Sequence, residues 1–143
     1  MVNLIAAPVD LLQPWTQFPH DVQIHSSIKI PLSDGSWLHA RAWIPEGATD
    51  NPVPALVEYA PFRHRDFTAP RDALIHPWFA GHGYVSLRVE LRGSGDSGGL
   101  PQDEYVLQEQ DDALEALEWI AAQDWCDGST GMFGMGLNSK PCG

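Results

Sequence analysis

A glycine-rich segment, Gly93-Ser-Gly-Asp-Ser-Gly98, has the spacing G-x-G-x-x-G and follows a predicted strand. This spacing is typical of loops that bind the pyrophosphate of a dinucleotide at a helix N-terminus. Here residues 99–101, Gly-Leu-Pro, separate the segment from any helix, and Asp96 would place a carboxylate where the pyrophosphate should lie. We therefore interpret the segment as a tight loop between a strand and the next helix, with Arg92 binding nearby backbone or carboxylates.

The six histidines are spread along the chain and form neither an H-x-x-x-H nor an H-x-E pattern. His64 lies in the polar run Arg63–Asp66, just past the end of a predicted strand, where α/β sheets place binding loops. We prefer a local ion-pair cluster as the interpretation of this run, with a ligand site as the alternative. The cysteines, Cys126 and Cys142, form no metal-ligand pattern. The sequence therefore predicts no metal site and no cofactor.

The segment Gly131-Met-Phe-Gly134 resembles the strand that leads into a nucleophile elbow. In an elbow, G-x-S-x-G, small flanking residues let a serine stand exposed on a sharp turn between a strand and a helix. By direct count Gly136 occupies the serine position, and glycine has no side chain that could attack a carbonyl. Ser139 is the nearby serine, but Asn138 and Lys140 flank it in place of glycines. We therefore predict no catalytic residue in this segment.

Hydrophobic periodicity predicts the elements that would position these residues. Alternation predicts strands at residues 22–30 and 37–44, joined by the Asp-Gly turn of residues 33–36 as an antiparallel hairpin. Nearly continuous apolar runs predict strands buried on both faces at residues 53–60 and 84–91. A short helix is expected at residues 72–80, and a short strand at residues 129–133.

The clearest helix is predicted for Asp103 to Gln123, followed by a turn at Trp125 to Gly128. Its apolar residues fall on one face at steps of three and four: Leu107, Ala113, Leu114, Leu117, Ile120 and Ala121. A hairpin followed by strand–helix–strand–helix–strand predicts an α/β domain with a mostly parallel sheet and flanking helices.

The composition is that of one acidic globular domain. The chain has 143 residues, 43% of them hydrophobic and 19% charged, and a formal net charge of −11. Because no cluster of Lys and Arg exists, nucleic acid and anionic membranes are excluded as expected partners. The segment Met1–Asp10 has no basic residue, and no apolar run approaches the ~20 residues of a membrane helix. We expect a soluble, cytoplasmic protein.

Together these segments resemble a known family. The chain is similar, over roughly residues 20 to 136, to the Xaa-Pro dipeptidyl-peptidase and cocaine-esterase-like serine hydrolases, which share the α/β-hydrolase fold. The segments that carry the resemblance, in order along the chain, are Pro31–Gly35, Glu58–Asp66, Arg88–Gly98, Asp103–Tyr105, Glu109–Asp112, Glu118–Trp119, Trp125–Gly128 and Gly131–Gly134.

The resemblance implies a mechanism in which a serine attacks an ester or amide carbonyl, a histidine acts as base and an aspartate orients the histidine. It also implies two oxyanion donors, the N–H after the serine and a tyrosine hydroxyl after a proline. Carried onto this sequence, the tyrosine position is Phe62, after Pro61, and phenylalanine has no hydroxyl. The family's Gly-x-Ser-Trp-Gly-Gly is matched here by Gly134–Ser139, as if Ser-Trp-Gly had been removed. The family's aspartate and histidine would lie beyond residue 143.

The resemblance therefore implies a truncated α/β-hydrolase fold in three parts: an irregular lead-in at 1–20, the N-terminal part of the hydrolase domain at 21–136, and an atypical tail at 137–143. We expect the N-terminal fragment of a serine hydrolase for a small ester or Xaa-Pro peptide, inactive on its own. The alternative is a non-catalytic α/β module that binds a partner or an acyl ligand. The strand at 129–133 is expected to be an exposed sheet edge through which the chain self-associates.

Overall fold

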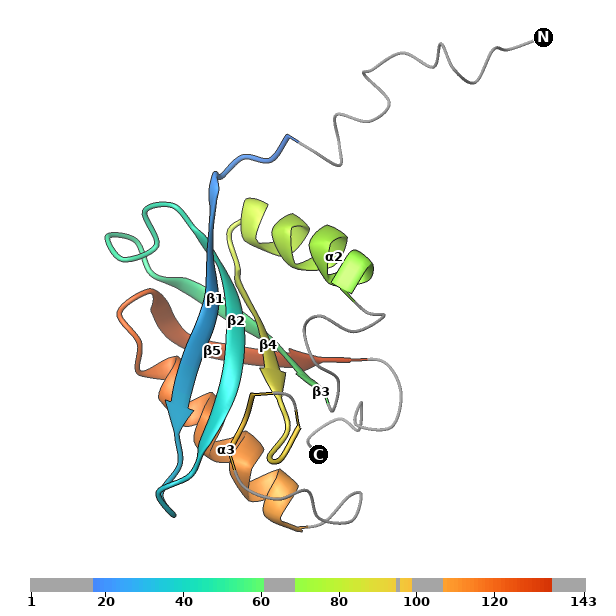
Figure 1. Cartoon of the computed structure of the whole chain (residues 1–143). Helices are drawn as coiled ribbons and strands as arrows, with labels where there is room; N and C mark the ends of the chain where they lie inside the picture. The colour runs from blue at the N-terminus through green and yellow to red at the C-terminus, as the bar shows by residue number, and fades with distance from the viewer. Residues whose placement is uncertain (1–16, 61–68, 95, 99–106, 135–143) are drawn as a thin grey trace, which may run out of the picture.

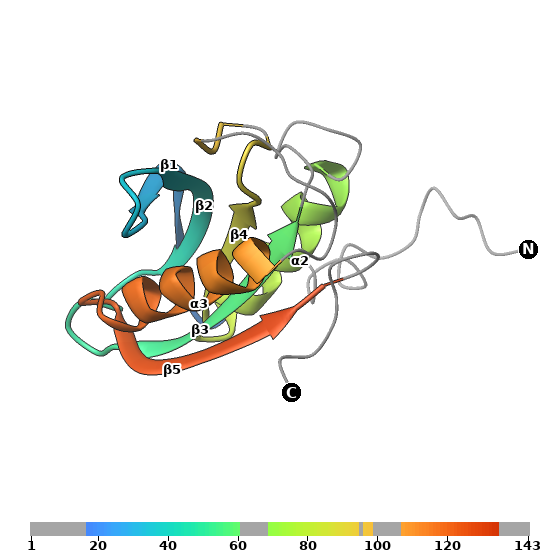
Figure 2. The ribbon, with the colours of Figure 1, turned by 90° about the horizontal axis from the view of Figure 1, so that it is seen from below.

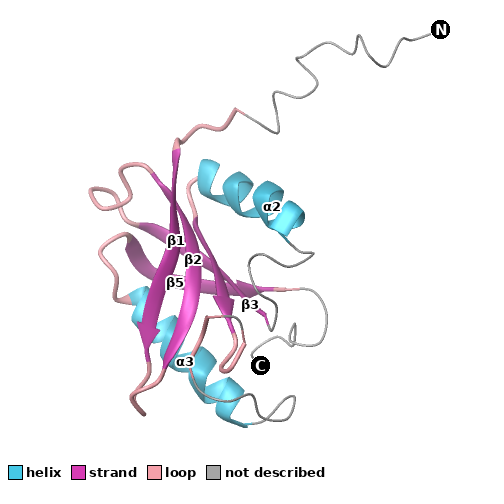
Figure 3. Ribbon diagram, viewed as in Figure 1, coloured by secondary structure: helices cyan, strands magenta, loops and turns pink. Residues whose placement is uncertain are grey.

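The computed structural model describes residues 17–60, 69–94, 96–98 and 107–134 of the chain (Figure 1). Within them the chain forms a five-stranded sheet in the order β1-β2-β4-β3-β5, together with helices α2 and α3. Figure 3 shows the strands in the middle of the molecule and the helices against the sheet. The predicted α/β class, a hairpin leading into parallel strands, is confirmed.

The N-terminal hairpin consists of β1 (Val22–Pro31) and β2 (Trp37–Pro45), which pair antiparallel. The turn between them is closed by Asp34, whose Oδ1 accepts a hydrogen bond of 2.9 Å from the backbone N–H of Ser36. Gly35 in this turn has a φ of 86°, a conformation that favours glycine. The hairpin is therefore as predicted, with each strand one residue longer.

The parallel part of the sheet contains β3 (Val53–Ala60), β4 (Val85–Glu90) and β5 (Cys126–Phe133). Strand β3 pairs parallel with β4 on one side and with β5 on the other, and β4 pairs antiparallel with β2. Both helices are connections between parallel strands, as the order of elements predicts.

The predicted turn at Trp125 to Gly128 is wrong, because β5 already begins at Cys126, which pairs with Val53. The register shifts between Val53 and Ala55, and Gly128 has a φ of 94°. Strand β5 therefore bulges at Gly128 and continues beyond it. The sequence instead predicted that the strand starts after this glycine.

Helix α2 (Ala69–Gly81) is longer than the predicted 72–80, and helix α3 (Leu107–Ala121) ends two residues before the predicted Gln123. Pro70 fits at the start of α2, where a missing N–H costs no intrahelical hydrogen bond. The predicted start of α3 at Asp103 lies outside the described residues. Viewed from below, the two helices lie on opposite sides of β3 and β4 (Figure 2).

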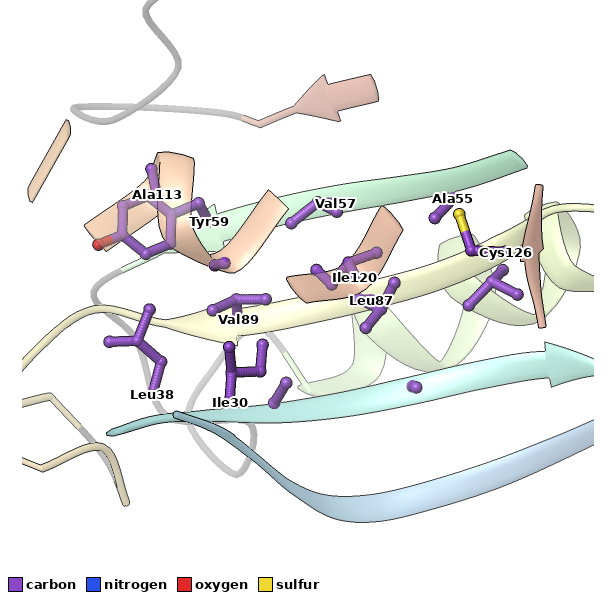
Figure 4. Close-up of a cluster of buried hydrophobic side chains, with 14 of the residues drawn as sticks. Ile30, Leu38, Ala55, Val57, Tyr59, Leu87, Val89, Ala113, Ile120 and Cys126 are labelled. Carbon is purple, nitrogen blue, oxygen red and sulfur yellow. The ribbon is translucent and has the colours of Figure 1, made fainter. Parts of the chain in front are cut away.

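The hydrophobic core lies between α3 and one face of the sheet (Figure 4). Alternate residues of the strands point into it, as a strand period of two requires. Its buried members include Ile30, Leu38, Ala40, Ala55, Val57, Leu87, Val89, Ala113, Ala116 and Ile120.

The predicted apolar face of α3 is partly wrong. Ala113 and Ile120 are buried, but Leu107 is 71% exposed and Leu114 is 54% exposed. Compared with the predicted orientation, the helix is rotated about its axis. The reason is that the fully buried carboxylate of Asp112 faces inward and pairs with Arg92. A stripe of leucines predicted the helix correctly, but the ion pair determines which face is buried.

Among the described residues, no helix combines the length and the apolar character that a membrane crossing requires.

Two substitutions on α3 test this orientation. We expect Ile120→Ala to lower the free energy of unfolding by about 2–5 kcal/mol, because it removes buried methyl groups and leaves a cavity. Leu114→Ala should change it by less than about 0.5 kcal/mol, because more than half of that residue is exposed to water. Urea unfolding followed by far-UV circular dichroism measures both. A loss for Leu114→Ala as large as that for Ile120→Ala would contradict the orientation described for α3.

Candidate functional site

Two parallel strands end at the same edge of the sheet. Strand β3 ends at Ala60, and β5 ends at Phe133, which is paired in register with Glu58. In α/β sheets, binding and catalytic groups collect at such carboxyl edges. The candidate site residues from the sequence follow the C-terminal ends of β3 and β5 along the chain. They are Phe62, His64, Gly136 and Ser139, and all four lie outside the described residues. Their roles stay predictions.

The face of the sheet beneath α2 is polar. The residues of β4 that alternate with its apolar core residues are Ser86, Arg88 and Glu90, and all three are buried. Glu58 of β3 lies beside Arg88 in the register of the two strands. Helix α2 thus covers charged side chains where α3 covers apolar ones.

Three side chains beneath α2 form a serine–histidine–carboxylate array. His76 of α2 has its Nδ1 2.6 Å from the Oγ of Ser86, and its Nε2 3.1 Å from the Oε2 of Glu58. Trp43 of β2 stacks on the imidazole, with ring centroids 4.3 Å apart and planes 8° from parallel. A serine, a histidine and an acid in hydrogen-bonded sequence are the groups of a hydrolytic triad.

This array is closed to substrate. His76 and Ser86 have no exposed surface, and Glu58 is 4% exposed. Ser86 lies within β4, which is paired with β2 on one side and with β3 on the other. A nucleophile must reach a carbonyl carbon and needs oxyanion donors close by. Here the adjacent backbone N–H groups belong to the sheet, so the array acts as a structural network.

Two arginines balance the carboxylates of this network. The Nη1 of Arg71 lies 2.8 Å from the Oε1 of Glu58 and 3.3 Å from the Oδ1 of Asp72. Arg88 forms an ion pair with the other oxygen of Asp72. Each buried carboxylate therefore has a guanidinium partner, as buried charges require.

The pKa values of Glu58 and Asp72 are shifted in opposite directions. Burial acts to raise the pKa of Glu58, but the hydrogen bond with His76 and the charge of Arg71 outweigh it, so the pKa is lowered. Burial also raises the pKa of Asp72, and there the charge of Arg88 only partly offsets it. Glu58 is thus the better stabilised of the two anions.

Glu58, Asp72 and His76 lie close enough to share a metal ion. However, both carboxylates already contact arginine, and Arg88 is itself buried against Asp72. A divalent cation would have to displace these guanidinium groups, because like charges cannot share the site without a large cost. The donor set therefore fits an ion-pair network better than a metal site.

The glycine-rich loop is folded onto β2. The Oε2 of Glu90 accepts a 2.8 Å hydrogen bond from the N–H of Asp96 and lies 3.2 Å from the Nδ1 of His39. The N–H of Gly98 donates to the carbonyl of Trp37 over 2.9 Å, and a Cβ at Gly98 would lie 3.0 Å from the Trp37 ring. The carboxylate of Glu90 thus accepts a loop N–H group that would otherwise be available to bind a phosphate. Gly98 allows close packing, because a side chain there would press against the ring of Trp37. These contacts support the tight-loop interpretation.

Arg92 binds carboxylates, as the sequence suggested, and in doing so it joins three parts of the chain. Its Nε and Nη2 each lie 2.8 Å from an oxygen of Asp112 in α3, and its Nη1 lies 2.8 Å from Asp34 in the hairpin turn. The hydrogen bond with Asp112 is the main cause of the raised pKa of Arg92. The N–H of Ser36, followed by Arg92, lowers the pKa of Asp34. The loop that follows β4 is therefore anchored at its second residue.

Sequence reasoning missed the network beneath α2, although a signal was present. Charged residues interrupt the two apolar strands that were predicted to be buried on both faces, namely Glu58 in one strand and Arg88 and Glu90 in the other. A charged residue in such a strand must be paired, which predicts buried partners elsewhere in the chain. The partners could not be identified, since His76 looks like any other histidine in the sequence.

Comparisons with known proteins point to one family. The family model of X-Pro dipeptidyl-peptidase (S15 family) matches residues 34–138. The cocaine esterase of Rhodococcus sp. (strain MB1 Bresler) is 33% identical over 116 residues, which cover 78% of this chain and 19% of that enzyme.

Two solved structures share the fold. The CocE/NonD family hydrolase from Staphylococcus aureus superposes with a TM-score of 0.66 at 22% identity, covering 78% of this chain and 23% of that one. An alpha-amino acid ester hydrolase gives a TM-score of 0.61 at 22% identity, covering 81% and 21%. The present chain spans about a fifth of the length of these relatives.

Neighbouring aspartates on α3 test the role of Arg92. We expect Asp112→Asn to lower the free energy of unfolding by about 3 kcal/mol or more, because it breaks a buried ion pair and leaves Arg92 undercompensated. Asp111→Asn, on the exposed side of the same turn, should change it by less than about 0.5 kcal/mol. Urea unfolding at neutral pH compares the two, and equal effects would show that the Arg92 pair contributes nothing.

The lowered pKa of Glu58 predicts a pH dependence. Because the folded-state pKa lies below the unfolded value, the unfolded chain binds more protons near pH 4, and the contribution of Glu58 to stability is lost as the pH falls through its folded-state pKa. We expect Glu58→Gln to flatten the loss of stability between neutral and acidic pH. Glu46→Gln, at an exposed position, should keep the wild-type slope. A wild-type slope in Glu58→Gln would contradict the assignment.

Proposed function

Since this chain belongs to the X-Pro dipeptidyl-peptidase (S15) family, we propose that it is the N-terminal part of a serine hydrolase module and that residues 1–143 alone do not catalyse hydrolysis. The substrate class is a small acyl ester or a peptide with Xaa-Pro, in line with the name of the family and of the esterase relative. The cytoplasmic location expected from the sequence belongs to the same proposal.

The observation that carries this proposal is the glycine at the nucleophile position within a chain that otherwise matches the family. The family match extends through residue 138. By direct count along the sequence, Gly136 falls at the position expected for the serine. A glycine offers neither a nucleophile nor a proton for a base to remove. Phe62 at the tyrosine position would also remove an oxyanion donor, a loss that typically costs about 100- to 1,000-fold in rate.

The described residues support a scaffold role. Strands β3 and β5 end side by side at the carboxyl edge of the sheet. The loop after β4 is fixed by Arg92, Glu90 and Trp37. Among the described serines, Ser86 does contact a histidine, but α2 and the neighbouring strands seal it from solvent. The chain thus supplies the frame of a hydrolase, and the serine that contacts a histidine side chain in the part described is closed to substrate.

An esterase and peptidase assay tests the proposal. We expect purified 1–143 to hydrolyse p-nitrophenyl acetate and an Xaa-Pro p-nitroanilide no faster than buffer containing the heat-denatured protein. Ser139→Ala and Ser86→Ala should behave like the wild type. Turnover that Ser139→Ala abolishes would identify Ser139 as a nucleophile. Turnover that Ser86→Ala abolishes would show that α2 opens to admit substrate.

The same preparation addresses the non-catalytic alternative. A folded chain without turnover that retains an acyl ligand or a protein partner on size exclusion would favour a binding module. A fluorophosphonate probe adds an independent readout, because covalent labelling requires an activated serine. We expect no labelling of the folded protein.

A further inference from the structure

The dipeptide Asp-Gly occurs twice in the chain, and serine follows it both times. One copy is Asp34–Gly35 in the turn between β1 and β2, and the other is Asp127–Gly128 near the start of β5. In each copy the Oδ1 of the aspartate accepts a hydrogen bond from the N–H of the serine, over 2.9 Å in the turn and 2.8 Å in β5. The two glycines have similar φ angles of 86° and 94°. Two sites with the same local chemistry therefore stand in different surroundings.

An aspartate that precedes a glycine can rearrange with no reagent other than water. The glycine nitrogen attacks the Cγ of the protonated carboxyl group, the N–Cγ bond forms, and the Cγ–O bond breaks. The hydroxyl group leaves as water with the proton of the nitrogen, and a cyclic imide remains. Water then adds to the main-chain carbonyl of the ring, whose bond to the nitrogen breaks. The product is isoaspartate, in which the chain runs through the side-chain carbonyl. Glycine favours the attack because it has no Cβ in the way.

The fold holds Asp34–Gly35 in a conformation that opposes this reaction. The Oδ2 of Asp34 lies 2.8 Å from the Nη1 of Arg92, whose other nitrogen atoms bind α3. The N–H of Gly35 donates to the carbonyl of Leu32 over 3.1 Å. The N–H of the following serine, and after it Arg92, lower the pKa of Asp34, so less of the carboxyl group is in the protonated form that loses water. Turning the side chain towards the glycine nitrogen would also break the ion pair.

Asp127–Gly128 lies in the bulge of β5, where the fold holds it less firmly. The register pairs Cys126 with Val53 and Thr130 with Ala55, so three residues of β5 face one residue of β3. Residues 127–129 are exposed, and a Cβ built on Gly128 would meet nothing within 4 Å. Within the described part of the chain, the Asp127 carboxylate is held by the N–H of the serine two positions on, with no guanidinium clamp.

We infer that Asp127–Gly128 is the site at which the folded chain converts to isoaspartate, and that Arg92 protects Asp34–Gly35 from the same reaction. The difference comes from the fold, because the local sequence and the hydrogen bond within each site are the same. The rearrangement adds one carbon atom to the main chain between the two register pairs that flank the bulge. A bulge takes up extra length without a change of register, so the product should stay folded. This inference is independent of the proposed absence of catalysis.

Peptide mapping of aged protein tests the inference. The chain is incubated for several weeks at neutral pH and physiological temperature, folded or in urea. It is then digested with the protease Asp-N, which cleaves before aspartate but not before isoaspartate, and the peptides are measured by mass spectrometry. In the folded chain we expect Asp127 to convert roughly fivefold faster than Asp34 or more. This ratio corresponds to about 1 kcal/mol in activation free energy, the size of an exposed ion pair.

The sample in urea supplies the reference, because unfolding removes the Arg92 contact and the bulge together. There the two sites should convert at similar rates. A folded-state ratio no larger than the ratio in urea would overturn the inference, as would a folded chain in which Asp127 does not convert.

Two aspartate-to-glutamate variants form a matched pair. Asp127→Glu keeps the charge but needs a larger ring to cyclise, so most of the isoaspartate formed by the folded chain should disappear. Asp124→Glu, at an exposed position three residues earlier, should form as much isoaspartate as the wild type. Methylation by a protein isoaspartate methyltransferase counts the product in the intact chain. Equal methylation of aged Asp127→Glu and wild type would assign the isoaspartate to another aspartate and overturn the inference.

Discussion

The arrangement around α2 depends on one buried charge, the guanidinium of Arg88 in the middle of the sheet. Strand β4 lies between β2 and β3, and α2 covers the face from which Arg88 projects, so this side chain is buried. Its register partner on β2 is Arg41, which has the same sign, and its register partner on β3 is the anion Glu58. Arg88 forms its ion pair with Asp72 on α2. Removing one member of such a pair leaves an uncompensated charge that costs several kcal/mol. Helix α2 must therefore dock with Asp72 over Arg88.

The two faces of the sheet are consequently held by different forces. Helix α3 is held mainly by burial of small aliphatic side chains, and the Arg92–Asp112 ion pair sets which of its faces is buried. Helix α2 is held by directed pairs, in which His76 lies between Ser86 and Glu58. Directed pairs define the orientation of a helix more narrowly than apolar contact, so the polar face accounts for the position of α2.

The elements of the fold were predictable because each has a strong local signal. The hairpin follows from alternation and an Asp-Gly turn, and β3 and β4 follow from apolar runs. The start of β5 was missed because Gly128 marks both turns and bulges, and only pairing with Val53 distinguishes them.

The side of α3 that is buried could not be predicted, since it depends on Arg92, 20 residues away from Asp112. The same limit applies to the candidate site. The charged residues within β3 and β4 signalled that buried partners exist, but a contact such as that of His76 with Glu58 arises only when the chain folds.

The polar contacts beneath α2 also join residues that are close in sequence. His76 and Ser86 are 10 positions apart, Asp72 and Arg88 are 16 apart, and Glu58 and His76 are 18 apart. Contacts between the hairpin turn and α3 span far more chain, since Ser33 and Glu115 are 82 positions apart. Closing the longer loop costs about 1.5 kcal/mol more in chain entropy than closing the shorter ones. The β3–α2–β4 unit therefore has the lower entropic barrier, and we expect it to form before α3 docks on the opposite face.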